Sequence, residues 1–239
     1  MKKRHLKLLF GISLFLTSCA AERSSLVNQA AIYSGYSLFH DESTQSLQAI
    51  SQFNFGGATG TYLELDKDSE VSFDNDKMNI DPNLIGQVFY RWSKDSLPMN
   101  EIWKEHRFTY KNNDGIVYQN TVSLPLLVTS RYSSEKVKLS SSVTIDWLSP
   151  NVIGTDSLNL LWVNAEGGVA LYQSIGGNLA ESTSGTVQIN SQELKKIGVG
   201  NYSAQLCRTR TKIAQQSPAQ GGTITMTSCH KKTSLQLIN

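Results

Sequence analysis

The 239-residue chain has little of what marks disordered, fibrous or low-complexity proteins. It holds only 5 prolines and 17 glycines, and 18% of its residues are charged while 39% are hydrophobic. This composition is too apolar and too weakly charged for a disordered chain, and it carries no collagen-like bias. The length therefore suits one large or two small domains with hydrophobic cores of their own.

The marks of several functional classes are also missing. The formal net charge is only +2, whereas a nucleic-acid-binding protein usually shows a concentrated excess of basic residues. The sequence contains no glycine loop of the kind that cradles phosphate, no zinc-ligand spacing and no catalytic motif. We therefore expect no nucleic-acid partner, no cofactor, no metal and no enzymatic activity.

Residues 1–18 have the layout of a secretory signal peptide. Four basic residues precede a short apolar run at 8–16. That run is far below the roughly 20 residues that a membrane-spanning helix needs, and no other stretch is long enough, so we expect the remainder to be exported. Because residues 1–18 hold four basic and no acidic residues, the exported chain has 18 basic against 20 acidic residues and a formal charge of −2.

The end of this segment, Leu16-Thr17-Ser18-Cys19, resembles the lipobox of bacterial lipoproteins. The resemblance implies that Cys19 is acylated, becomes the mature N-terminus and anchors the protein in a membrane, since two or more acyl chains anchor stably. Ala20 stands where an Asp tends to retain lipoproteins at the inner membrane, so the resemblance implies the outer membrane, facing the periplasm or the surface. In the alternative, an ordinary signal peptide, Cys19 is incidental. We expect residues 19–28 to be a lipidated polar tether.

Lipidation of one of the three cysteines leaves Cys207 and Cys229 as a pair. If residues 201–212 and 222–232 form antiparallel strands, Cys207 can lie opposite Cys229, with Thr209 opposite Thr227. Disulfides persist in the periplasm and at cell surfaces, so we predict a structural disulfide. The alternative, a metal or redox pair, lacks CxxC spacing. The sequence AQQSPAQGG between the two strands predicts a polar, mobile loop.

Short alternating runs recur at intervals of roughly 8–12 residues between clusters of Gly, Asn, Asp and Ser, which predicts an all-β fold of sandwich type. In the first unit, an N-terminal β domain at 29–125, we expect strands at 46–55, 61–66, 70–74, 86–92 and 106–111. A hairpin over 106–122 is predicted to turn at Asn113-Asp114-Gly115, pairing Tyr110 with Tyr118, because that register gathers Phe108, Tyr110, Ile116, Tyr118 and Val122 on one face. This unit resembles a recurrent module of uncharacterised proteobacterial lipoproteins, which implies no activity.

The second unit, residues 126–239, is predicted to hold strands at 141–150, 158–164, 168–174 and 185–189 and a helical turn at 191–198. It resembles fibronectin type III and other immunoglobulin-like modules in Trp147 with Pro150 just after it, and in the segment that leads through Gly200 to Tyr202. The resemblance implies a β-sandwich in which the Tyr202 hydroxyl bonds to upstream backbone. The disulfide departs from that family, since it joins neighbouring strands. Together the units predict two β-sandwich modules.

Two clusters of polar residues are candidates for chemistry. Five carboxylates crowd into residues 66–76, where a calcium loop competes with a solvated acidic turn; the segment lacks the Gly that a calcium loop places at its sharp turn. Ser37, His40 and Asp41 contain the residue types of a catalytic triad, but the Gly of a nucleophile elbow is absent and neighbouring strand residues point to opposite faces. We expect the ordinary structural interpretation of both clusters.

The densest aromatic and basic region contains Arg91, Trp92, Trp103 and Arg107. Such residues often anchor protein or ligand contacts, so we name these four as possible contact residues. In the alternative interpretation, both tryptophans belong to the sandwich core and the arginines solvate its rim.

These patterns predict a lipid-anchored cell-envelope protein that acts as a structural or protein-binding component, for instance an accessory subunit of an envelope assembly or secretion apparatus. Its expected partners are the membrane, through the N-terminal lipid, and other envelope proteins. One alternative is a surface adhesin or ligand-binding lipoprotein, and another is an envelope hydrolase, which needs a clustered catalytic site in the folded chain.

Overall fold

The computed structural model of the protein describes residues 21–81, 87–126, 128–149, 156–175 and 183–239. The predicted signal peptide at 1–18, the predicted lipid attachment site Cys19 and Pro150 lie outside these ranges. Within them, no helix is long and apolar enough to cross a membrane.

Most of the described residues lie in β-strands, as the alternating sequence pattern predicts. The strands before residue 126 are β1 (Glu22–Arg23), β2 (Ile32–Asp41), β3 (Ser46–Phe55), β4 (Thr61–Glu64), β5 (Glu70–Phe73), β6 (Asp76–Lys77), β7 (Asn79–Ile80), β8 (Tyr90–Lys94), β9 (His106–Lys111) and β10 (Val117–Val122). The later strands are β11 (Thr129–Tyr132), β12 (Lys136–Lys138), β13 (Val143–Leu148), β14 (Asp156–Asn164), β15 (Val169–Ile175), β16 (Ser184–Ile189), β17 (Gly200–Ile213), β18 (Gly222–Cys229) and β19 (Thr233–Ile238). The helices are η1 (Ser24–Leu26), η2 (Gln29–Ala31), α1 (Met99–Ile102) and α2 (Ser191–Ile197).

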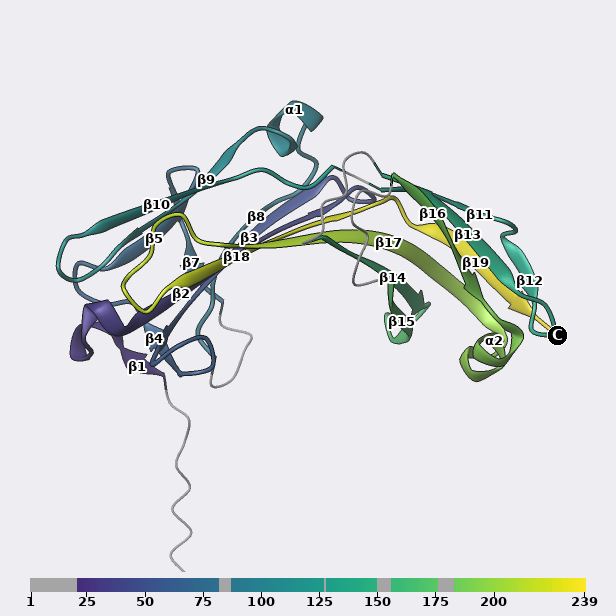
Figure 1. Ribbon diagram of the computed structural model, residues 1–239, viewed down its shortest axis with the longest axis horizontal. Coiled ribbons are helices and arrows are strands. Elements are labelled where there is room, and N and C mark those ends of the chain that lie inside the picture. Colours follow the sequence, from purple (N-terminus) through teal and green to yellow (C-terminus); the bar gives the residue numbers. More distant parts are fainter. Residues whose placement is uncertain (1–20, 82–86, 127, 150–155, 176–182) are drawn as a thin grey trace, which may run out of the picture.

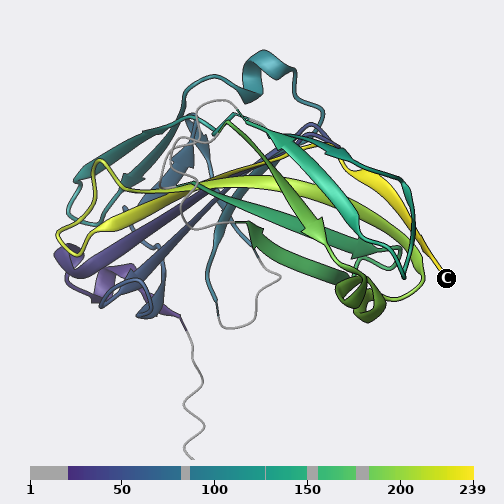
Figure 2. The same ribbon diagram turned by 45° about the vertical axis from the view of Figure 1, so that its right-hand side comes forward.

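One 12-stranded sheet runs through the whole molecule, with the main order β1-β4-β3-β2-β18-β17-β14-β15. A four-stranded sheet, β10-β9-β5-β6, packs on it at one end and a three-stranded sheet, β11-β13-β16, at the other. Figure 1 and Figure 2 show the long sheet curving from one half of the molecule into the other. We call the two packed ends the N-terminal sandwich and the C-terminal sandwich. The predicted all-β sandwich architecture is confirmed.

Each sandwich has its own hydrophobic core. The N-terminal core includes Tyr36, Phe53, Phe73, Phe108 and Tyr110, from both of its sheets. The C-terminal core is built in the same way, by the side chains Ile145, Trp147, Leu158, Trp162, Leu206 and Leu235 among others. In most of these strands the core side chains alternate with outward-facing ones, so that one face is buried. The exception is β17, where residues 204–208 are all buried and both faces of the strand are covered.

The strands β17 and β18 belong to both sandwiches, so a boundary at residue 125 does not separate the two cores. Residues 202–210 of β17 pair with β14, and residues 207–213 pair with β18. The strand β18 pairs in parallel with β2, a pairing that the sequence analysis did not predict. As a result Ile224 and Met226, assigned from the sequence to the second unit, lie in the N-terminal core.

Several local predictions are confirmed. In the hairpin of β9 and β10, Tyr110 pairs with Tyr118, and Gly115 has the left-handed φ of 79° that its turn position requires. Ile116, however, is 51% exposed and does not join the buried face. The predicted helical turn is α2, and the Tyr202 hydroxyl donates to the Ile197 carbonyl at 3.1 Å.

The loop between β17 and β18, predicted to be mobile, instead covers the outer edge of β10. The Gln216 N–H donates to Asn120 Oδ1 at 3.0 Å, and Asn120 Nδ2 donates to the Gln216 carbonyl at 2.8 Å. The Gln216 side chain also accepts from the Gln119 N–H at 2.8 Å. These bonds satisfy groups that an edge strand otherwise leaves open, so the loop has a fixed place.

Residues 22–28, predicted to be part of a tether, are also folded. Glu22 of β1 pairs in parallel with Leu63 of β4, and Ser24 is fully buried. The Gln29 side chain donates to the Ser24 carbonyl at 2.7 Å. A polar sequence became ordered here because its hydrogen-bonding groups find partners inside the N-terminal sandwich.

Candidate functional site

The predicted disulfide between Cys207 and Cys229 is present, and it lies where the long sheet passes from one sandwich to the other. On one side, Cys207 of β17 pairs with Asn159 of β14. On the other, Cys229 of β18 pairs with Asp41 of β2. The bridge therefore joins two central strands at the junction, and Thr209 bonds to Thr227 at 2.9 Å beside it.

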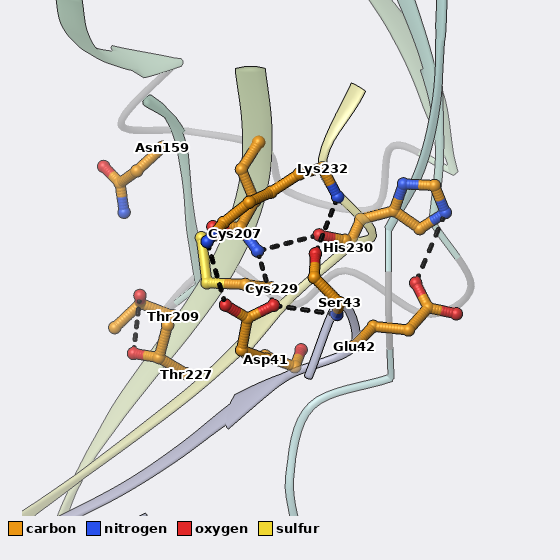
Figure 3. Close-up of a disulfide and its surroundings, with 12 residues drawn as sticks. Asp41, Glu42, Ser43, Asn159, Cys207, Thr209, Thr227, Cys229, His230 and Lys232 are labelled. Carbon is orange, nitrogen blue, oxygen red and sulfur yellow. Dashed lines mark hydrogen bonds and ion pairs between the residues drawn. A yellow bond between two sulfur atoms is a disulfide. The ribbon is translucent and has the colours of Figure 1, made fainter. Parts of the chain in front are cut away.

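A set of polar contacts surrounds the disulfide (Figure 3). Asp41 Oδ1 accepts from Gln205 Nε2 and from the Ser43 N–H, both at 2.9 Å. The Ser43 hydroxyl accepts from the Lys232 N–H at 2.8 Å, and the Glu42 carboxylate lies 3.6 Å from His230. The turn that follows β2 is thereby fastened to the chain that follows β18.

Besides the disulfide, a buried cluster of charged side chains connects the strands at the junction. Asp156 is fully buried and accepts from Arg208 Nε at 2.9 Å and from Arg210 Nε at 2.7 Å. Arg208, 1% exposed, also donates to the Ser149 hydroxyl at 3.0 Å and to the Leu126 carbonyl at 3.4 Å. The Arg208 guanidinium on β17 thus contacts three other parts of the chain: the connection between the sandwiches at Leu126, the end of β13 at Ser149, and β14 at Asp156.

The three residues of the candidate triad do not form a catalytic relay. His40 is fully buried, its Nδ1 lies 2.9 Å from the Ser46 carbonyl, and its ring packs edge-on against Trp103. Asp41 is bonded to Gln205, and Ser37 faces a groove on the outer side of the sheet. The alternation of side chains along β2 keeps His40 and Ser37 on opposite faces.

The crowded carboxylates at 66–76 are distributed over separate contacts. Asp66 accepts from the Ser25 hydroxyl at 2.6 Å and the Ser25 N–H at 2.8 Å. Burial acts to raise the pKa of Asp66, but these bonds and one from Ser24 together hold it below its usual value. Asp74 instead bonds to His106. In the described part of the chain, no group of three or more His, Cys, Asp or Glu side chains is placed to hold a metal ion.

The four possible contact residues do not form one surface. Trp92 and Trp103 are partly buried against the N-terminal core, and the Trp92 indole donates to Asp76 at 3.0 Å. The Arg91 side chain lies on the face of β8 opposite to Trp92 and forms an ion pair with Asp81 at 2.7 Å. Arg107 is exposed on β9. The tryptophans are therefore part of the sandwich wall, and Arg107 is the most open of the four.

Between α1 and β9 the structure places a contact that the sequence analysis did not predict. His106 is 1% exposed; its Nδ1 lies 2.8 Å from Asp74 and its Nε2 3.0 Å from the Ile102 carbonyl. Both ring nitrogens are thus occupied by contacts within the fold. The ring lies beside a cavity of about 130 Å³ that Trp92 and Lys104 also line. These contacts connect the end of α1 with β9 and with the turn after β5.

The outer face of the N-terminal sandwich carries a groove of about 320 Å³ across β3, β2 and β18. Gly35 forms part of its floor, since a Cβ there would lie 3.0 Å from the Gln52 side chain. The rim includes Phe89 and Tyr33, whose hydroxyl bonds to Thr223 at 2.8 Å. Aromatic faces beside hydroxyl and amide groups suit a small polar ligand.

Comparisons with known proteins find no family model and no curated protein that matches this chain. Among solved structures, it is similar to latent PorU from Porphyromonas gingivalis, with 12% identity, a TM-score of 0.32 and coverage of 83% of this chain and 19% of that one. The ICAM-5 D1–D4 ectodomain fragment matches with 8% identity, a TM-score of 0.31 and coverage of 86% and 51%. Murine CEACAM1b matches with 10% identity, a TM-score of 0.25 and coverage of 86% and 100%. The chain thus spans much less than the full length of the first two.

Proposed function

We propose that this protein is a lipid-anchored component of the bacterial outer membrane that binds other envelope proteins, as an accessory subunit of an envelope assembly such as a secretion apparatus. The observation that carries the proposal is the fixed junction between the sandwiches: one continuous 12-stranded sheet, locked by a disulfide and by a buried ion cluster. The signal peptide and the sequence ending at Cys19 supply the location.

A fixed junction suits a scaffold because it holds two binding surfaces at one distance and angle. The Ser228 hydroxyl donates to the Pro125 carbonyl at 2.6 Å, and Arg208 bonds to the next carbonyl, so the connecting chain is held as well. A partner that contacts both sandwiches then orders little of the protein on binding, which lowers the entropic cost of association.

In-cell crosslinking tests this proposal. We would place a photoreactive residue at Arg107 on the N-terminal sandwich or at Tyr172 on the C-terminal one, both exposed. The expected result is capture of defined envelope proteins from both positions. Only random, concentration-dependent products would contradict the scaffold. Palmitate labelling that survives Cys19→Ala would contradict the anchor separately.

A second candidate, a ligand-binding lipoprotein or adhesin, is favoured by the groove at Gly35. Filling the groove with Gly35→Val should abolish binding to an array of glycans and host proteins if the groove is the site. Ser174→Val at an exposed position of β15 in the C-terminal sandwich, away from the groove lining, serves as the matched control. Binding that both variants keep would exclude the groove, and no binding by the wild type would exclude this candidate.

A further inference from the structure

The fold begins very close to the predicted lipid. Glu22 is already paired with Leu63, and Cys19 lies three residues before it. Since an extended chain spans at most about 3.6 Å per residue, an anchor at Cys19 lies within about 11 Å of Glu22. A lipid at Cys19 would therefore have no long spacer between it and the N-terminal sandwich, and it would hold this end of the molecule near the bilayer surface.

Four segments meet at the end of the N-terminal sandwich where the chain enters it: η1–η2, the turn after β3, the β9–β10 hairpin and the β17–β18 loop (Figure 1 and Figure 2). Hydrogen bonds join them. The Asn113 N–H donates to the Gln29 side chain at 3.1 Å, the Gln220 N–H to the Ala30 carbonyl at 2.9 Å, and the Gly56 N–H to the Ala31 carbonyl at 3.2 Å. They form one connected surface.

The segments that meet here expose large apolar side chains, namely Leu26 (70%) in η1, Ile116 (51%) in the β9–β10 hairpin and Phe55 (37%) at the end of β3. Two other exposed apolar residues, Val117 (47%) and Ile213 (80%), lie on the outer faces of the four-stranded sheet and of the long sheet. We call Leu26, Ile116 and Phe55 the apolar end. Exposed apolar groups gathered on one end commonly mark a contact with a membrane or a protein. The nearby exposed charges, Arg23 and Asp114, are of opposite sign, so the surface is not a basic patch.

We propose that the apolar end rests on the lipid bilayer, with its side chains in the boundary between headgroups and acyl chains. This inference depends on the lipid anchor of the proposed function. The anchor places this end at the surface, and burial of the apolar side chains then favours contact over free rotation about the short connection. Because the contact is apolar, it does not require anionic lipid.

Fluorescent probes at single new cysteines test the contact on the full-length lipidated protein. Leu26→Cys and Ile116→Cys report on the apolar end, and Tyr172→Cys, a 64% exposed position on β15, is the matched control. The other cysteines are acylated or disulfide-bonded, so only the new thiol reacts. In phosphatidylcholine vesicles that contain a doxyl-labelled lipid, we expect quenching at the first two positions to be several-fold stronger than at Tyr172.

Each other outcome has a distinct meaning. Equal quenching at all three positions, or stronger quenching at Tyr172, overturns the proposed contact. The proposed contact is also overturned if the probes at Leu26 and Ile116 are protected from water before vesicles are added, because a second copy of the chain then covers the apolar end. Mass spectrometry of the same sample separates the two proposals: without a diacylglycerol on Cys19 the anchor fails, whereas an acylated protein with water-exposed probes refutes the contact alone.

Discussion

The buried ion cluster at the junction makes a sharp prediction for Asp156→Ala. The substitution leaves the guanidinium of Arg208, 1% exposed, without its carboxylate partner. Removing one member of a buried ion pair typically costs about 3–5 kcal/mol, because the remaining charge stays out of water. For a chain of this size each kcal/mol lowers the unfolding midpoint by roughly 2–4 °C, so we expect a decrease of roughly 6–20 °C by circular dichroism.

Matched variants separate lost charge pairing from lost packing. Arg210→Met removes a partner that is 27% exposed, so it should cost no more than about 1 kcal/mol. The double variant Asp156→Leu with Arg208→Met removes both charges of this pair, so neither position is left with a buried charge. It should therefore recover most of the stability lost in Asp156→Ala. If Asp156→Ala costs less than about 1 kcal/mol, or no more than Arg210→Met, the reasoning about the buried cluster is refuted.

Three further predictions concern other contacts. Replacing Cys207 and Cys229 by Ser should destabilise the protein by roughly 3 kcal/mol in urea unfolding, and unchanged non-reducing gel mobility would contradict the bridge. Asn120→Ala removes both bonds to Gln216, so we expect a loss of about 1–3 kcal/mol and faster proteolysis of the β17–β18 loop, whereas an unchanged cleavage rate would contradict this. Folding lowers the pKa of Asp66, so its contribution to the free energy of unfolding is complete above the unfolded value of 3.8 and is lost as the pH falls through the folded value. The stability advantage of wild type over Asp66→Asn should therefore shrink below about pH 4 in unfolding experiments. A difference that stays constant with pH would refute this linkage.

Strand register could be predicted from the sequence where the partner strand is close along the chain. In the β9–β10 hairpin, alternation and turn chemistry leave one register that gathers the apolar side chains. In the β17–β18 pair, placing Cys207 opposite Cys229 gave the register, which also aligns Thr209 with Thr227. The alternation of apolar and polar residues does not identify a strand partner that is distant in sequence, so it did not predict the parallel pairing of β2 with β18. For the same reason the sequence did not show that Ile224 and Met226 pack in the N-terminal core.

Polar segments were hardest to predict, because their order depends on distant partners. Residues 22–28 have the composition of a tether, but Ser24 is buried beside Asp66, which lies 42 residues away in sequence. His106 lies in a strand that the sequence predicts, yet its partners Asp74 and the Ile102 carbonyl come together only through the packing of α1. Local sequence holds no signal for such contacts.

The shared strands bear directly on the choice between a scaffold and a simple ligand-binding protein. Two modules on a flexible linker sample many relative positions, and a partner that contacts both must suppress that freedom. Here β17 contributes to both sandwiches, while Arg208 and Ser228 hold the connecting carbonyls. The C-terminal sandwich therefore has one position relative to the N-terminal one, and the proposed anchor at Cys19, separated from Glu22 by only two residues, would restrict its height above the membrane. A ligand that fills only the groove at Gly35 gains nothing from this restriction, whereas a partner that spans both sandwiches does.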